Sequence, residues 1–434
     1  MKRLKQLAML LLMVFVSGCG QAQAVSASVL PSSSEPASVS EISQVQSVSQ
    51  IVPESYGEGY FSLEDDDQQA PDAQQIQLML NYMDLYYESM ARMEPLDPAP
   101  LFADENADQA MGNRMVWEYL IETRKMLPGD LSVEHYEYTL TLRRMQQQED
   151  GSVSIMVRED SVQNFALSPQ VDSESFGVYH SFVLVQQQGE WKLQSHMQLD
   201  SLYYIVVLGN PNSDRSMYQQ RSFDTQEEDA QQYFERLLDE LLEQARENIA
   251  SRAQGEAQTL QVAHQYDRQA AVDYAMEWVE QRNDYWPDYG IYGGNCQNYI
   301  SQCLDAGGIP MDSYGAYVWK WYGDTPNNSA GTFGRSASWS GVEEFRDYAE
   351  NNDGFGLVAQ VEAPFDSGEI GDILELGTQN DWKHTVLIVD VITDEKGNTV
   401  DYLINSNTAN LRNFPAGAYG YTLQSLVKVA GWND

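Results

Sequence analysis

The sequence predicts an α+β protein with two folded domains and a long helix between them. Three observations predict this class. Two stretches with helical spacing precede several strand-like alternations, a separate amphipathic stripe follows, and the last part of the chain places a helix before further strand-like runs. With 434 residues, of which 42% are hydrophobic and 11% aromatic, the chain is long enough for two hydrophobic cores.

The composition argues against several classes of function. The chain carries 25 Lys and Arg against 65 Asp and Glu, a formal net charge of −40, so we expect no nucleic-acid partner. Three cysteines are too few for a disulfide-rich scaffold or a multi-cysteine zinc site. The five histidines form no H-E-x-x-H pattern. We therefore expect no metal and no cofactor.

The amino terminus has the pattern of an export signal. Basic residues precede an apolar run over 7–16, about half the roughly 20 residues that a spanning helix needs. Val16-Ser17-Gly18-Cys19 resembles the bacterial lipobox, which implies cleavage before the cysteine and attachment of lipid to it. We expect a signal peptide over 1–18 and a lipid anchor at Cys19 on the extracytoplasmic face of the bacterial membrane. The alternative is a secreted protein that loses Cys19.

The next segment has the composition of a flexible linker. Between residues 25 and 50, ten of the 26 residues are serine and none is Lys or Arg. Such a segment cannot bury a core. The acidic run over 64–67 continues it. We expect a disordered linker, including the lipidated cysteine, over residues 19–71.

The first folded domain is expected over residues 72–208. One helix is indicated by apolar residues from Ile76 to Met90, and a second ends at Pro128-Gly129. Alternating residues then predict antiparallel strands near 136–143, 153–157, 178–185 and 191–193. The order is similar to nuclear-transport-factor-like or cystatin-like domains. We assign no role to this domain, and we expect its aromatic residues to form a core rather than a ligand cavity.

A long amphipathic helix is expected within residues 209–258. Apolar residues from Tyr233 to Ile249 form one stripe, and Thr225 with Glu228 fits a capping box. The stripe predicts packing on a neighbouring domain. A coiled-coil dimer is the alternative, so the oligomeric state stays open.

The last domain, residues 259–434, carries the candidate chemistry. Glycines 293 and 294 lead into a helix for which Asn295 is a suitable N-cap, and this places Cys296 in the first turn. Unpaired N–H groups and the positive end of the helix dipole stabilise a thiolate there. The same N–H groups can hold an oxyanion. Cys303 is seven residues further along, about 10 Å by helical rise, too far for a disulfide, so we expect it in the core.

A nucleophilic thiol needs a general base, and His384 is the one histidine that follows it. His384 opens a strand-like run that ends in a turn and a second strand. If this hairpin is symmetric about its turn, Thr385 faces Asn407, whereas Asn405 pairs near Leu387. We therefore predict that Asn407 accepts a hydrogen bond from Nδ1–H of the imidazole, with Asn405 as the open alternative.

Further residues are candidates for oxyanion or substrate contacts. Tyr292 precedes the glycine turn and either lines the site or packs, while Asn295 and Gln297 flank the thiol. Trp339 could form the floor of a substrate groove, although core packing is the favoured interpretation.

Several motifs of this domain resemble the bacterial putative amidase domain, over roughly residues 264–434. The resemblance implies a papain-like fold, a cysteine-bearing helix on an antiparallel sheet, with Cys296 as nucleophile and His384 as base. Two positions depart from the family pattern: Asn295 stands where Asp is usual, and Asn407-Thr408 stands where a His-Thr pair is often found. The matching motifs are Tyr266–Ala275, Gly293–Gly308, Ser338–Val342, Gly371-Asp372-Ile373 and His384-Thr385.

Together these features predict a membrane-anchored, extracytoplasmic cysteine amidase or peptidase. It would hydrolyse amide bonds in peptides or peptidoglycan stem peptides through a thioester. The alternative is a catalytically idle surface lipoprotein that binds cell-wall material or a protein partner. A third interpretation is acyl transfer to an amine instead of water, by the same residues.

Overall fold

A computed structural model describes residues 55–65, 67–199, 229–252, 256–290, 294–323, 334–378 and 381–434. The chain divides into units Met1–Val52 and Pro53–Asp434, and all described residues belong to the second. The signal peptide, Cys19, the capping pair at Thr225 and Glu228, and Tyr292 lie outside the described ranges. Within those ranges, no helix has both the length and the apolar character needed to cross a membrane.

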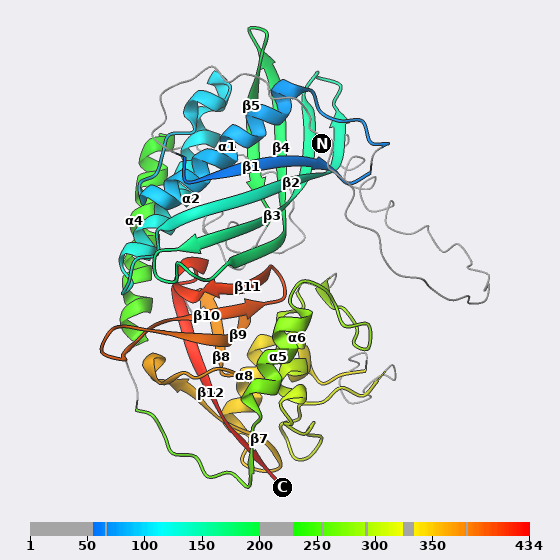
Figure 1. The fold of residues 1–434 in the computed structure, drawn as a ribbon, viewed down its shortest axis with the longest axis vertical. Helices are drawn as coiled ribbons and strands as arrows, with labels where there is room; N and C mark the ends of the chain where they lie inside the picture. The colour runs from blue at the N-terminus through cyan, green and yellow to red at the C-terminus, as the bar shows by residue number, and fades with distance from the viewer. Residues whose placement is uncertain are drawn as a thin grey trace, which may run out of the picture. The chain divides into compact units, whose positions relative to one another are not determined.

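The described residues form a mixed α+β structure around one twelve-stranded sheet (Figure 1), which confirms the predicted class. The strand order is β1-β2-β3-β4-β11-β10-β9-β8-β12-β6, with β5 beside β4 and β7 beside β12. The strands are β1 (Gly57–Leu63), β2 (Val133–Gln147), β3 (Val153–Phe165), β4 (Ser173–Gln187), β5 (Glu190–Gln198), β6 (His264–Gln265), β7 (Gly356–Ala363), β8 (Ile373–Thr378), β9 (Asp381–Thr393), β10 (Thr399–Ser406), β11 (Asn410–Pro415) and β12 (Leu423–Asn433).

The N-terminal half, residues 55–199, has the predicted order of two helices followed by antiparallel strands. Helix α1 (Ala73–Arg92) begins at a capping box, in which Asp72 and Gln75 each accept a backbone N–H of the other at 2.9 Å. Helix α2 (Ala107–Lys125) ends shortly before Pro128, as predicted. Strands β2 to β5 then pair in sequence order.

Strand β1 lies inside the segment for which we predicted a disordered linker. It pairs in parallel with β2, and Gly57 and Gly59 face Tyr136 and Tyr138 there. A Cβ on Gly57 would lie 1.8 Å from the Tyr136 carbonyl oxygen, and one on Gly59 would lie 2.2 Å from the Tyr138 ring. Residues 57–63 are therefore ordered because glycines permit close approach to two tyrosines 79 residues away, which composition does not reveal.

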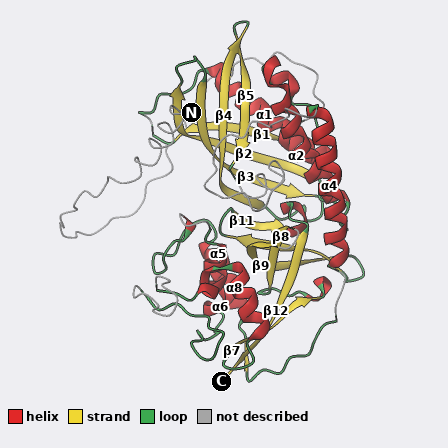
Figure 2. Cartoon of the chain, turned by 180° about the vertical axis from the view of Figure 1, so that it is seen from behind, coloured by secondary structure: helices red, strands yellow, loops and turns green. Residues whose placement is uncertain are grey.

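Helix α4 (Ala230–Ser251) begins after its N-cap Asp229, whose side chain accepts the Gln231 N–H. Its apolar stripe is buried, with Phe234 and Leu237 in the core that also holds α2. Near its other end, α4 contacts β12 (Figures 1 and 2). This confirms that the stripe packs on neighbouring structure within the chain.

The two predicted folded regions share the sheet. Strand β11 pairs antiparallel with β4, from Asn410 opposite Phe176 to Arg412 opposite Glu174, and Arg412 also forms an ion pair with Glu174. Backbone pairing across this boundary joins the N-terminal half to the C-terminal half, residues 256–434.

The C-terminal half has different packing on the two faces of its sheet. On one face, Leu387 and Ile373 pack in a cluster with residues of helices α5 (Arg268–Trp278), α6 (Cys296–Ala306) and α8 (Val342–Asn351). On the other face, Val386, Ile388 and neighbouring side chains join the core that contains α1, α2 and α4. The side chains of β9 therefore alternate between the α6 face and the face shared with the N-terminal half.

Candidate active site

Cys296 is the first residue of α6, and 8% of its surface is exposed. The buried stripe of this helix consists of Tyr299, Ile300, Cys303 and Leu304. The helix ends at Ala306, with Gly307 as its C-cap. Cys303 is fully buried, and burial raises the pKa of its thiol well above the usual range. Cys303 is therefore a core thiol with little tendency to ionise.

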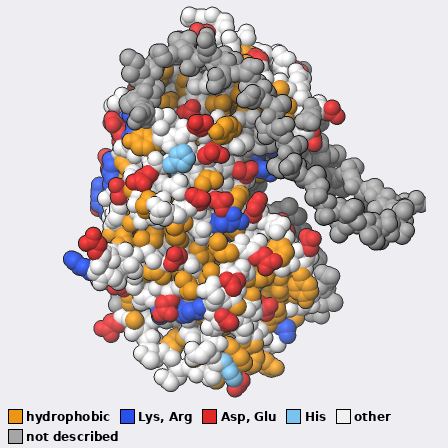
Figure 3. Space-filling view, in the orientation of Figure 1, with side chains coloured by type: hydrophobic (Ala, Val, Ile, Leu, Met, Phe, Trp, Pro, Cys, Tyr) orange, Lys and Arg blue, Asp and Glu red, His pale blue; other side chains and the backbone are white. Residues whose placement is uncertain are grey.

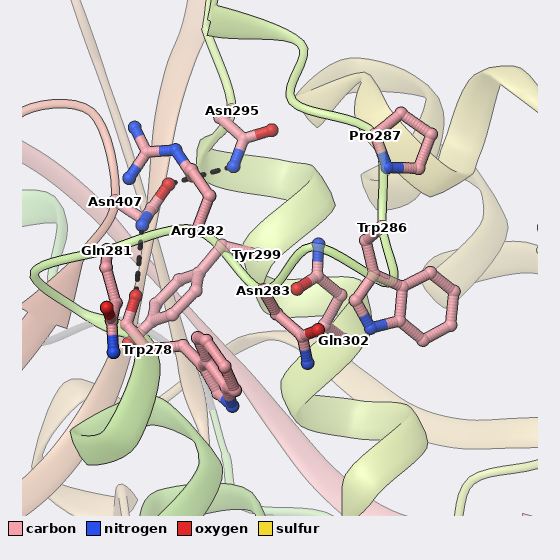
Figure 4. A pocket seen from close by; sticks show the side chains of 10 residues that line it. All are labelled: Trp278, Gln281, Arg282, Asn283, Trp286, Pro287, Asn295, Tyr299, Gln302 and Asn407. Carbon is pink, nitrogen blue, oxygen red and sulfur yellow. Dashed lines mark hydrogen bonds between the residues drawn. The ribbon is translucent and has the colours of Figure 1, made fainter. Parts of the chain in front are cut away.

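Asn295 occupies the N-cap position, as predicted, but its side chain does not cap α6. Its Oδ1 accepts hydrogen bonds from Tyr289 N at 3.0 Å and Asn298 Nδ2 at 2.9 Å. Its Nδ2 donates to Asn407 Oδ1 at 2.8 Å (Figure 4). The capping hydrogen bond that we expected is thus wrong, because this amide joins the helix start to the end of β10.

His384 lies near the start of β9, and its ring is 5% exposed. Nε2 lies 2.8 Å from Ser406 Oγ and 3.3 Å from the Tyr419 hydroxyl. The ring meets Tyr419 edge-on at 5.6 Å between centroids, and stacks with Tyr421 at 6.1 Å. Ser406 Oγ also donates to Thr408 O at 3.5 Å, and on this basis we assign to His384 the tautomer in which Nε2–H donates to the Ser406 oxygen.

The predicted pairing of β9 with β10 is confirmed, because Asn405 lies opposite Leu387. Neither asparagine, however, makes the expected contact. Asn407 accepts from Asn295 and donates to Trp278 O at 3.3 Å (Figure 4), and Asn405 bonds Asn413 N at 2.9 Å. Ser406 contacts the ring instead. An offset of one residue along a strand turns the side chain to the other face, so Asn407 points away from His384.

The structure brings Cys296 and His384 to the same end of the sheet. The segment Ser406–Thr408 connects them: Ser406 holds the ring of His384, and Thr408 Oγ1 accepts the N–H of Asn295 at 2.9 Å. The register places His384 opposite Leu376, on the face shared with the N-terminal half, whereas α6 packs on the other face. A register shift between β8 and β9 immediately precedes His384.

A small, partly open pocket lies beside the start of α6 (Figure 4). Trp278 and Trp286 line it together with Tyr299, and Asn295 and Asn407 form part of its wall. The pocket therefore lies next to the residue that precedes the thiol, on the α5 side of α6.

Two of the remaining candidates have structural contacts. Trp339 is fully buried, stacks on Trp319 at 4.9 Å between centroids, and donates to Asn298 Oδ1 at 2.8 Å, so it is a core residue as favoured. Gln297 is also buried, and its Nε2 approaches Ser301 Oγ at 3.4 Å. In the part of the chain that the structure describes, no group of three His, Cys, Asp or Glu could hold a metal ion.

Sequence reasoning missed Ser406 and Tyr419. Ser406 is adjacent to the predicted Asn407, and a strand alternation anchored on His384 and Ser406 could have found it. Tyr419 lies in a loop after β11, and no local pattern places that loop beside β9.

Comparisons with known proteins point to an amidase-like domain in this half. A family model described as "Putative amidase domain" matches residues 265–427, which indicates an amidase-like hydrolase. The uncharacterized protein YhbB of Bacillus subtilis (strain 168) is 32% identical over 168 residues, covering 37% of this chain. The chain matches 48% of that relative, about half its length. No solved structure matches the chain.

Proposed function

We propose that the protein is a membrane-anchored, extracytoplasmic cysteine amidase or peptidase with a papain-like catalytic half. Cys296 is the nucleophile and His384 the general acid and base. The observation that carries this proposal is that the Ser406–Thr408 segment contacts both His384, through Ser406, and Asn295, the residue before Cys296, through Thr408. The family match over residues 265–427 supports the reaction class.

In the proposed mechanism, the Cys296 thiolate attacks the carbonyl carbon of an amide. The N–H groups in the first turn of α6 do not donate to the N-cap side chain of Asn295, and we assign them to the oxyanion. Because Ser406 accepts from Nε2–H of His384, the neutral ring carries its lone pair on Nδ1, and we assign proton transfer to Nδ1. His384 protonates the leaving amine, and then activates water against the thioester.

The substrate class we propose is a peptide or a peptidoglycan stem peptide. Acidic side chains are scattered over the face seen in Figure 3, with few basic ones among them. Such a surface repels anionic wall polymers, so a peptide that diffuses to the site or a brief encounter with the wall fits better than tight docking. A lipid on Cys19 would keep the enzyme at the membrane surface.

Digestion of purified cell wall tests the proposal. The protein from residue 20 onward should release peptides or amines that mass spectrometry identifies, and Cys296→Ala and His384→Ala should release none. Cys303→Ala is the matched control, because that thiol lies in the core. Equal release by the wild type and Cys296→Ala would refute the cysteine mechanism. Added amine that appears in the products would indicate acyl transfer.

One observation favours the alternative of an idle binding protein. The contacts of the His384 ring with Ser406, Tyr419 and Tyr421 belong to the face of the sheet opposite α6. If the ring stays on that face throughout, it does not serve Cys296. In that case iodoacetamide should alkylate Cys296 at the same rate in the wild type and in His384→Ala.

A further inference from the structure

The loop from Ala416 to Thr422 carries Tyr419 to the imidazole of His384. It starts with a 3-10 turn, Ala416–Tyr419, and continues through Gly420, whose φ of 86° is in the left-handed region that favours glycine. The loop has no strand partner until β12 begins at Leu423. Its buried carbonyl groups therefore need other donors.

Most of those donors come from outside the C-terminal half. Arg124 Nη2 donates to Ala418 O at 3.1 Å, and the Tyr119 hydroxyl to Gly420 O at 3.4 Å; both residues are on α2. On α4, Asn248 Nδ2 donates to Thr422 Oγ1 at 3.0 Å.

Arg252 at the end of α4 completes this set. Its Nη2 donates to Thr422 O at 2.9 Å and to Tyr421 O at 3.3 Å. All four donor residues precede the region that matches the amidase family, which begins at residue 265. Within the matched region, Gln424 Nε2 donates to Ala416 O at 3.1 Å and to Tyr421 O at 2.9 Å. The carbonyl groups of Ala418, Gly420 and Thr422 are held by structure that the family model does not include.

Arg124 shows that these contacts are not simply favourable for folding. Its side chain is 3% exposed, and among the described residues its Nε and Nη1 have no hydrogen-bond partner. Burial of a guanidinium group without an acidic partner is unfavourable, and a hydrophobic residue would pack there at lower cost. The hydrogen bond of this buried guanidinium group runs from Nη2 to the carbonyl oxygen of Ala418 in the loop.

We propose that α2 and α4 position the general base, because they hold the loop that places the Tyr419 hydroxyl on His384 Nε2. Tyr419 is a positioning residue, and Arg124 and Arg252 act through it. The N-terminal half is then part of the catalytic unit. This inference rests on the proposed function, since it assigns a role at the same site.

The pH profile of Cys296 alkylation tests the inference in the full chain without a substrate. Iodoacetamide labelling, located by peptide mass mapping, is followed from pH 5 to 9 in the wild type, His384→Ala, Arg124→Met and Tyr419→Phe. A cysteine paired with imidazolium stays reactive in acid. We expect labelling at pH 6 to slow on the order of 10- to 100-fold in Arg124→Met and Tyr419→Phe, towards the His384→Ala profile. Arg124→Lys, which keeps a cationic donor, should recover part of the rate.

The control is Arg158→Met, which removes a cation from the N-terminal half without touching the loop, since Arg158 pairs with Asp160. It should leave the profile unchanged. If the wild type differs from His384→Ala while Tyr419→Phe and Arg124→Met match the wild type, the inference is overturned and the proposed function survives. If the wild type equals His384→Ala, both are overturned. Thermal unfolding of each variant shows whether it is folded. If Arg124→Met does not fold, the labelling profile of Tyr419→Phe, which keeps the buried ring, decides for or against the inference.

Discussion

The N-terminal and C-terminal halves both bury histidine, but they surround it in different ways. In the N-terminal half, His180 contacts Glu159 Oε2 at 2.8 Å and His196 at 3.0 Å, and His196 Nδ1 lies 3.2 Å from Asn113 Oδ1. His180 is 1% exposed and lies on strands inside the core. In the C-terminal half, His384 lies near the start of β9 and contacts Ser406, two residues before the Thr408 side chain that accepts the N–H of Asn295 at the start of α6.

The difference shows that a buried, well-bonded imidazole is not by itself a catalytic site. Both side-chain nitrogens of His180 are committed to protein side chains. Two hydroxyl groups, those of Ser406 and Tyr419, lie within hydrogen-bond distance of Nε2 of His384. A hydroxyl group holds the ring without a fixed charge, which suits a base that must gain and lose a proton.

The largest expected difference between the two histidine environments is the effect on catalysis when each histidine is removed. His384→Ala should lower kcat/KM for amide hydrolysis by about 10³-fold or more, because a nucleophile loses its base. His180→Ala should leave kcat/KM nearly unchanged at temperatures where the variant is folded. Hydrolysis of a chromogenic peptide amide, with circular dichroism as the folding control, measures both. A large loss in both variants would mean that the N-terminal network also serves the reaction.

A variant at Glu159 measures what the buried histidine network of the N-terminal half contributes to stability. This carboxylate is 5% exposed, contacts His180, and accepts a short hydrogen bond from the Tyr87 hydroxyl. Glu159→Leu should lower the free energy of unfolding by about 3 kcal/mol, because it leaves two buried polar groups without their acceptor. Urea denaturation measures this loss. Leu78→Ala is a comparison for ordinary core damage, and an unchanged stability in Glu159→Leu would show that the network contributes nothing to folding.

Much of the fold follows from local patterns. The first helix of the N-terminal half, the helix that begins at Cys296 and the hairpin register that sets Asn405 opposite Leu387 are all confirmed, because each depends on residues close in sequence. Strand β1, the pairing of β4 with β11 and the contact of Tyr419 with His384 were not predicted. They depend on packing between segments far apart in the chain, which a single sequence does not specify.

Variants at Ser406 and Asn407 test which of these two neighbouring residues orients the ring of His384. Ser406→Ala removes the hydroxyl group that accepts from Nε2–H of His384. It should lower kcat on the order of 10-fold with little change in KM, because the ring loses its preferred orientation. Asn407→Ala should act mainly on stability, since its amide joins Asn295 to Trp278. The reverse result, a larger loss of kcat in Asn407→Ala, would restore the assignment made from the sequence.

The smallest expected effect is an opposed pH dependence of stability in the two halves. Burial, and next the neighbouring His180, hold the pKa of His196 well below its usual value. The contribution of His196 to the free energy of unfolding is therefore present above about pH 6.5 and is lost as the pH falls. In the C-terminal half, burial raises the pKa of Asp401 to about 6. The contribution of Asp401 to the free energy of unfolding is therefore present in acid and is lost as the pH rises from about 4 to 6. The two slopes oppose each other, at no more than about 1.4 kcal/mol per pH unit each.

Two variants separate these slopes. Asp401→Asn keeps an acceptor for Gly417 N and removes the compensating group, so its free energy of unfolding should fall more steeply than that of the wild type as the pH drops from 6 to 4.5. His196→Gln should show the opposite change. Urea denaturation at half-unit steps of pH measures both. Because Asp401 also lies beside the loop that carries Tyr419, parallel curves for all three proteins would show that neither buried group titrates in this range, and that the two halves do not differ in how burial controls their charge.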